Sequence, residues 1–279
     1  MLQMFSYSFV QYALLASLIF AGIHAYLGFH VVSRGIIFVD ISLAQAAAFG
    51  SIVAVIAGLP DHSISTYFVS LTFTFIGAAI ISVARSKDER IPQEAFIGIV
   101  YAGFSVGVIL LLTGRPEGSE ELHKMLSGSL LTVTKSDLIS TAILYSAIGI
   151  FHWLLRGRFF RLSDDRAGAV ADGWSVGWWD FLFYASFGFV VTSSVHMAGV
   201  LLVFSLLVIP PVNALIFTRK QSARLLLGWG VALLGSVMGI LISTGMDLPT
   251  GPAIIASLIL ILLISILFKK AADFVKKSG

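Results

Sequence analysis

Four polar side chains lie within apolar stretches of this sequence and could bind a metal ion or line a substrate path: Asp40, Gln45, His24 and His30. Carboxylate, amide and imidazole groups are costly to place in lipid, so residues of these types in apolar segments are functional candidates. Because the chain contains no cysteine, any metal ligands must be histidine, carboxylate, amide or backbone oxygen. We therefore take these four residues as candidates for a substrate or metal pathway.

Each candidate also has a structural interpretation. Asp40 could cap its helix or pair with Arg34, which lies six residues upstream. A single histidine in a helix is more often a hydrogen-bonded packing residue than a ligand. His24 and His30 are about 240° apart around a straight helix, so they cannot share one face. The sequence leaves both interpretations open.

Motifs for catalysis are absent from the sequence. It contains no His-Glu-x-x-His pair, no Gly-x-Ser-x-Gly elbow and no phosphate-binding loop of the Gly-x-x-x-x-Gly-Lys type. The chain therefore does not hydrolyse ATP alone by any arrangement that we identify, and we predict no catalytic residue. Nucleic acid is not an expected partner, because the basic residues lie at the ends of apolar segments.

The elements that must position these side chains are membrane helices. Hydrophobic residues make up 57% of the 279 residues and charged residues only 12%, whereas about a quarter of a soluble domain is charged. Apolar stretches of about 20 residues, the length that crosses a bilayer, recur along the chain. We predict an all-α integral membrane protein, a polytopic bundle of about eight or nine transmembrane helices in a single domain over residues 1–279. The predicted spans are roughly 8–30, 36–57, 63–84, 92–112, 137–155, 177–193, 198–217, 224–243 and 251–268.

The basic residues give these spans a direction. All but three of the 18 lysines and arginines fall in alternate connections or at the C-terminus. By the positive-inside rule that side is cytoplasmic, which places the C-terminus inside and, with nine spans, the N-terminus outside. The spans on either side of a predicted outer hairpin at 193–196 are the least certain pair. If they form one span, the N-terminus moves inside.

Two segments stand out between or within the spans. The cytoplasmic connection at 162–174 predicts a short helix, with Ser163 as its cap and Gly173 at its end. This helix is either an ordinary loop helix or a docking helix for a cytoplasmic partner. Pro210 and Pro211 predict a break in the seventh span, which is a feature of transport pathways but also of simple packing kinks.

Four groups of residues, taken in order, resemble the membrane subunits of ABC importers for zinc, manganese and iron. They are 33–50; 94–100; 164–173 with 199–203 and 205–210; and 247–252. Each stretch is weak alone, since membrane helices share composition. Their joint order and spacing cover nearly the whole chain and make the match specific.

The resemblance implies a type II ABC importer-like fold in the cytoplasmic (inner) membrane of a prokaryote. It implies a homodimer, a cytoplasmic ATP-binding subunit that carries the ATP, and an extracytoplasmic substrate-binding protein. The divalent metal would be the transported substrate, with no permanently bound cofactor. The stretch 164–173 aligns with the coupling helix that docks on the ATPase, and its candidate residues are Asp164, Asp165, Arg166, Gly168, Asp172 and Gly173. The candidate gating or helix-breaking residues are Pro210, Pro211, Pro249, Gly251 and Pro252.

The second span departs from the family pattern. The family usually has aspartate and histidine four residues apart there, on one helix face. This chain has Asp40 but Ala44 at the fourth position, and Gln45 takes the histidine position only if one residue is inserted. A π-bulge would absorb that residue and restore the shared face. His24 or His30 could instead supply the imidazole.

The leading hypothesis is the transmembrane permease subunit of an ATP-driven importer for a divalent metal ion, zinc, manganese or iron. Movement of 164–173 would open and close a path by alternating access, with Asp40 as the first candidate for substrate contact. Three alternatives remain: a permease for a chelated metal or other small solute, a secondary transporter or channel without an ATPase, and an intramembrane enzyme. The last lacks an identifiable nucleophile with its base.

Overall fold

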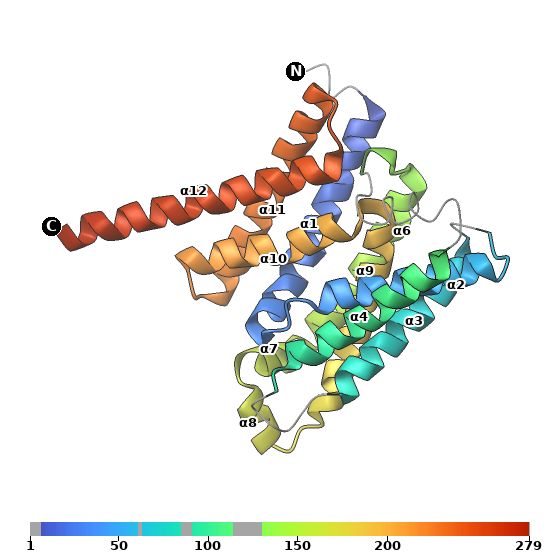
Figure 1. The fold of residues 1–279 in the computed structure, drawn as a ribbon. Helices are drawn as coiled ribbons and strands as arrows, with labels where there is room; N and C mark the ends of the chain where they lie inside the picture. Colours follow the sequence, from blue (N-terminus) through green and yellow to red (C-terminus); the bar gives the residue numbers. More distant parts are fainter. Residues whose placement is uncertain (1–6, 61–62, 85–90, 114–129, 279) are drawn as a thin grey trace. The chain divides into compact units, whose positions relative to one another are not determined.

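The computed structural model describes residues 7–60, 63–84, 91–113 and 130–278, and the regular structure in these ranges is helical throughout (Figure 1). Nine of the described helices are long and apolar enough to cross a membrane, as predicted. They are α1 (Ser8–Arg34), α2 (Val39–Ile56), α3 (Ile64–Val83), α4 (Gln93–Leu112), α6 (Lys135–Leu154), α9 (Val176–Ala198), α10 (Val200–Phe217), α11 (Gln221–Met246) and α12 (Thr250–Ser278). Three shorter elements are η2 (Leu130–Thr132), α7 (Arg156–Asp164) and α8 (Arg166–Ala171).

The chain forms two compact units, each built from separate stretches of sequence. The terminal unit contains Met1–Val32, Ser127–Tyr145 and Met197–Gly279, and the central unit contains Ser33–Leu126 and Ser146–His196. Helices α1, α6 and α9 each contribute residues to both units. The expectation of a single membrane domain over 1–279 stays a prediction.

In the central unit, α2 packs directly against α3 and α4, and Figure 1 shows these three helices side by side. Gly50 allows the close approach, because a Cβ atom there would lie 2.8 Å from the Cα atom of Ser70 on α3. The Ser70 hydroxyl donates a hydrogen bond of 2.7 Å to the carbonyl of Ala47 on α2. Small residues at the contact are typical of membrane helices, which associate by close packing rather than by the hydrophobic effect.

In the terminal unit, α10, α11 and α12 pack against one another. Helix α11 ends where Asp247 adopts a left-handed conformation with φ of 54°. The Ser243 hydroxyl donates to the carbonyl of Leu248 at 2.6 Å and lies 3.1 Å from the hydroxyl of Thr250. Pro252 occupies the first turn of α12, where its missing N–H costs little. Of the predicted gating or helix-breaking residues, Pro249 lies between α11 and α12, and Gly251 and Pro252 lie in the first turn of α12.

The predicted break at Pro210 and Pro211 is wrong, because α10 continues as one helix through both prolines. A proline has no N–H, so the carbonyls of Leu206 and Leu207 lose their helical partners. Gly28 of α1 packs here, and a Cβ atom on it would clash with the Leu207 carbonyl oxygen. The neighbouring helix backbone thus covers the site of the missing bond. A gating role for the two prolines stays a prediction.

The predicted hairpin at 193–196 is also misplaced. Helix α9 continues to Ala198, and the chain turns at Gly199, whose φ of 78° suits glycine. The hydroxyls of Ser193 and Ser194 donate to the carbonyl of Val190 within the helix, so these polar residues do not end it. The spans on either side are two separate helices, as the count of nine requires.

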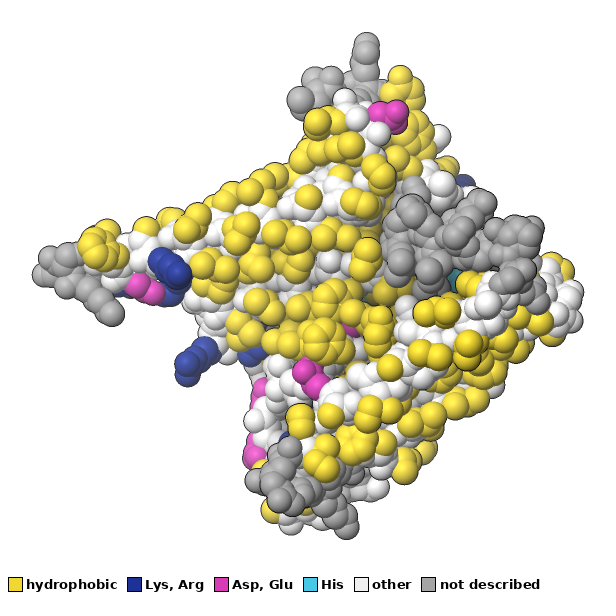
Figure 2. All heavy atoms as spheres, in the orientation of Figure 1, with side chains coloured by type: hydrophobic (Ala, Val, Ile, Leu, Met, Phe, Trp, Pro, Cys, Tyr) yellow, Lys and Arg dark blue, Asp and Glu magenta, His cyan; other side chains and the backbone are white. Residues whose placement is uncertain are grey.

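The outer faces of the long helices carry large hydrophobic side chains (Figure 2). Exposed examples occur in both units and include Ile64, Val83, Leu110, Leu226 and Leu267. A water-soluble monomer rarely exposes apolar surface on this scale. These faces are therefore suited to contact lipid.

Candidate functional site

Asp40 lies in the first turn of α2 and is only 2% exposed. Its Oδ1 atom has no hydrogen-bond partner among the described residues. Arg34 forms an ion pair with Asp180, not with Asp40, so the expected structural pairing of Asp40 with Arg34 is not found. The positive end of the α2 dipole favours the carboxylate, but one of its buried oxygens lacks a hydrogen-bond partner in this part of the chain.

Gln45 and Asp40 do not share a face of α2. The helix is regularly α-helical from Val39 to Ile56, so no π-bulge brings Gln45 onto the face of Asp40. Five residues correspond to about 140° around a regular helix, and the two side chains therefore diverge. Ala44, four residues after Asp40, lies on its side of the helix. Gln45 is itself buried, at 6% exposed.

His24 and His30 lie on α1 in the terminal unit, and both are fully buried. The Nδ1 atom of His24 lies 2.9 Å from the carbonyl oxygen of Phe20, and its ring packs edge-on against Tyr145. The His30 ring packs edge-on against Tyr26 and Phe29. Within the described residues, no three or more histidine, aspartate or glutamate side chains gather as a metal site. A ligand role for these histidines stays a prediction.

The predicted docking helix is present as α8, which follows α7 after the single residue Asp165. Asp165 caps α8, since its Oδ1 atom accepts a 2.9 Å hydrogen bond from the N–H of Gly168. The expectation that Ser163 caps this helix is wrong, because Ser163 is the penultimate residue of α7. Gly173, with φ of 74°, lies in the turn after α8 as predicted.

An exposed ion-pair network holds the outer side of this connection. Arg161 of α7 pairs with Asp165 at 2.8 Å and with Asp172 at 3.1 Å. The three side chains are between 40% and 55% exposed. Asp164 is also exposed. Exposed pairs of this kind contribute little to stability because water screens them.

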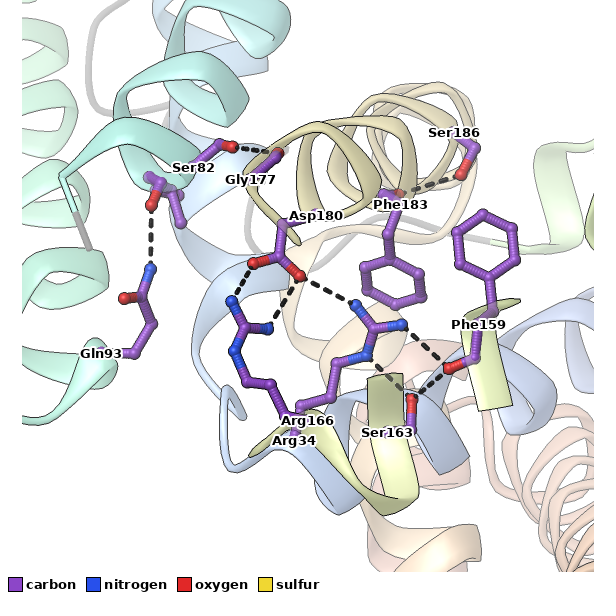
Figure 3. Close-up of polar contacts among 11 residues, drawn as sticks. Arg34, Ser82, Gln93, Phe159, Ser163, Arg166, Gly177, Asp180, Phe183 and Ser186 are labelled. Atoms are coloured by element: carbon purple, nitrogen blue, oxygen red, sulfur yellow. Dashed lines mark hydrogen bonds and ion pairs between the residues drawn. The ribbon is translucent and has the colours of Figure 1, made fainter. Parts of the chain in front are cut away.

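A buried ion-pair network holds the inner side (Figure 3). Arg166, the first residue of α8, donates two hydrogen bonds to Asp180 of α9, at 3.0 Å to Oδ1 and 2.6 Å to Oδ2. Arg34, the last residue of α1, donates to Oδ1 of the same carboxylate at 3.4 Å. Asp180 is 2% exposed and Arg34 4% exposed. We call Arg34, Asp180 and Arg166 the buried triad.

Arg34 has further partners from α7 and α9. Its Nε atom donates to the Ser163 hydroxyl at 2.9 Å, and its NH2 group donates to the carbonyl of Phe159 at 3.3 Å. The guanidinium lies 4.1 Å from the centre of the Phe183 ring, a distance typical of a cation–π contact. The triad therefore ties the ends of α1, α7, α8 and α9 together.

Sequence reasoning missed this triad. Asp180 was not among the candidate residues, and Arg34 was considered only as an alternative partner of Asp40. The three residues are separated by up to 146 positions in the chain, so no local spacing connects them. The available signal was a carboxylate inside an apolar helix, which requires a buried cation as its partner.

Comparison with known proteins agrees with this architecture. Residues 6–269 match the model of the ABC 3 transport family. The chain is 27% identical to the "Manganese transport system membrane protein MntC" of Halalkalibacterium halodurans, over 99% of this chain and 91% of that protein. It is 24% identical to the "Chelated iron transport system membrane protein YfeD" of Yersinia pestis, over 95% of this chain and 86% of that protein. The structure of PsaBC from Streptococcus pneumoniae in complex with Fab shares the fold, with a TM-score of 0.78, 23% identity and 95% coverage of both chains. The chain belongs to the ABC 3 transport family.

Proposed function

We propose that this chain is the membrane permease subunit of an ATP-driven importer for a divalent metal ion, most directly Mn²⁺ or Fe²⁺. The family match over residues 6–269 is the observation that carries this proposal. Relatives that align along nearly the whole chain are named for manganese and for chelated iron transport. A protein of this class needs no nucleotide site of its own, because a separate ATP-binding subunit supplies the hydrolysis.

The side chains of α2 support manganese or iron over zinc. This helix offers oxygen donors in Asp40, Ser42 and Gln45, and it contains no histidine. Carboxylate and carbonyl oxygens suit Mn²⁺, whereas zinc sites in proteins favour imidazole and thiolate. Asp40 is the one carboxylate in the described part of α2, and its buried Oδ1 atom has no hydrogen-bond partner among the described residues. We infer that Asp40 contacts the metal during transport.

The connection formed by α7 and α8 supports a coupling role. Helix α8 is short, it lies between two membrane helices, and half of its six residues are exposed. The distribution of basic residues supports a cytoplasmic location for α8 and for the C-terminus. We infer that an ATP-binding subunit docks here and that two copies of this chain form the permease. Movement of α8 would then drive alternating access, and an extracytoplasmic binding protein would deliver the metal.

Co-purification tests the assignment to an ATP-driven system. The detergent-solubilised chain should retain an ATP-binding subunit, and replacing the exposed Val170 of α8 with aspartate should release it. A matched substitution in α12, Phe274→Asp, should leave the complex intact. If no ATP-binding subunit associates with the wild-type chain, the protein is a secondary transporter or channel instead.

The form of the cargo is a separate question, because one relative is named for chelated iron. Uptake of free Mn²⁺, Fe²⁺ and Zn²⁺ should be compared with uptake of ferric chelates in the same membranes. The oxygen donors of α2 predict that free Mn²⁺ or Fe²⁺ is carried faster than Zn²⁺. If only the chelates are taken up, the chain is a permease for a chelated metal, and the free-metal proposal is wrong.

A further inference from the structure

The linker between α1 and α2 is held at two points in the central unit. At its start, Arg34 is bonded to Asp180, Ser163 and the Phe159 carbonyl. Three residues later, the backbone N–H of Ile37 donates a 2.7 Å hydrogen bond to Oε1 of Glu94 at the start of α4. The residue three positions beyond Ile37 is Asp40. The candidate metal ligand is therefore joined to the buried triad by a short linker with little freedom.

Helix α8 is attached to the same carboxylate. Both terminal nitrogens of Arg166 donate to Asp180 in a two-bond arrangement (Figure 3). Such bidentate pairs fix orientation as well as distance. Asp180 thus accepts hydrogen bonds from the docking helix through Arg166 and from the end of α1 through Arg34.

The buried contacts of Asp180 and the exposed pairs of Arg161 differ in how they transmit a movement of α8. Packed, buried regions switch between discrete arrangements and do not deform continuously. A carboxylate that is 2% exposed between two guanidinium groups is part of such a region. The exposed Arg161 pairs on the other side of α7 can exchange with water at little cost. The buried triad is therefore the fixed connection between α8 and the end of α1.

We propose that Asp180 is the positioning residue that transmits movement of α8 through Arg166 and Arg34 to the linker before Asp40. In this role Asp180 does not touch the metal. It makes the orientation of Asp40 depend on the position of the docking helix. The inference rests on the proposed function, and the following experiment separates the two.

The test compares transport with ATP hydrolysis in the complete complex. The permease with its ATP-binding subunit is reconstituted in proteoliposomes, and Mn²⁺ uptake and ATP hydrolysis are measured in the same samples. In Asp180→Asn, uptake per ATP hydrolysed should fall at least about tenfold, within the range of typical coupling free energies. Hydrolysis itself should continue. The control Lys269→Gln removes an exposed ion pair with Asp273 and should leave the ratio unchanged.

A second variant keeps the test valid if Asp180→Asn does not fold. Arg166→Lys retains the charge of a residue that is 24% exposed but cannot form the two-bond arrangement. Arg166→Lys should lower the Mn²⁺ uptake per ATP hydrolysed by a smaller factor than Asp180→Asn does. If uptake and hydrolysis instead fall in parallel with the amount of folded complex, Asp180 has only a structural role and the inference is wrong. If the wild-type complex transports no metal, the proposed function itself is wrong, and the inference about Asp180 falls with it.

Discussion

Asp40 and Asp180 are two aspartates near the start of a helix in the central unit, and each is 2% exposed. Their surroundings differ completely. Asp180 accepts hydrogen bonds from Arg34 and Arg166 on both oxygens. Asp40 has an oxygen without a hydrogen-bond partner in the described part of the chain.

The difference separates a carboxylate whose partners lie within the protein from the carboxylate that the proposed function assigns to the metal path. A buried carboxylate is costly unless it is paired or hydrogen-bonded. Asp180 meets that requirement within the protein, so its site is closed. Asp40 does not, and under the proposed function the transported cation would supply the missing interaction. Four substitutions test this contrast.

The largest effect on stability is expected at Asp180. Asp180→Ala leaves the guanidinium of Arg34 buried beside Arg166 without its carboxylate partner. Breaking a buried ion pair in this way costs about 3–5 kcal/mol. Denaturant unfolding of the detergent-solubilised protein measures the loss. A change below about 1 kcal/mol would show that the pair is no more important than a surface pair.

The largest effect on transport is expected at Asp40. Asp40→Asn removes the charge that attracts the cation and should reduce Mn²⁺ uptake by about 100-fold, the upper range for losses at metal sites. Thermal stability should not fall, because a neutral amide costs less to bury than an unpaired carboxylate. Uptake assays and melting curves on the same preparation decide the outcome. Unchanged uptake would remove Asp40 from the pathway.

A change of metal preference is expected when a histidine is added beside Asp40. Ala44→His places an imidazole four residues after Asp40 on the same face and should raise Zn²⁺ uptake relative to Mn²⁺ by about tenfold. Overpacking at the buried Ala44 site should cost about 1–3 kcal/mol. The control Gln45→His puts the imidazole on another face and should leave the preference unchanged. Equal shifts in both variants would contradict the geometry of α2.

The smallest effect is expected at the exposed network of α7. Arg161→Gln removes the pairs with Asp165 and Asp172, and exposed pairs contribute about 0–1 kcal/mol. Denaturant unfolding at low and high salt measures this difference, which should decrease further as salt screens the charges. A loss as large as that of Asp180→Ala would show that burial does not separate the two networks.

Hydrophobicity and length predicted most of the fold. The predicted span 92–112 corresponds to α4 at Gln93–Leu112, and the span 198–217 corresponds to α10 at Val200–Phe217. The errors occurred where a local signal was outweighed by its surroundings. Serines at 193 and 194 bond within α9 and do not end it. Proline at 210 and 211 was taken as a break, but the neighbouring α1 covers the affected carbonyl through Gly28.

The candidate site was only partly predictable. Asp40 was identified because a carboxylate in an apolar segment is costly, and its burial agrees with that reasoning. The π-bulge that would bring Gln45 onto the face of Asp40 is not present, since the intervening residues fit a regular helix. The partner of Asp180 could not be found from spacing, because Arg34 is 146 residues away in the chain. Long-range pairing of this kind follows from the fold and not from a local pattern.

The most direct test of the central claim is ATP-dependent Mn²⁺ uptake by proteoliposomes that contain the permease with its ATP-binding subunit. The wild-type complex should accumulate Mn²⁺ only when ATP is hydrolysed, and Asp40→Asn should reduce accumulation by about 100-fold while the complex stays assembled. Accumulation that continues without ATP, or that is unaffected by Asp40→Asn, would contradict an ATP-driven importer with its metal path at α2.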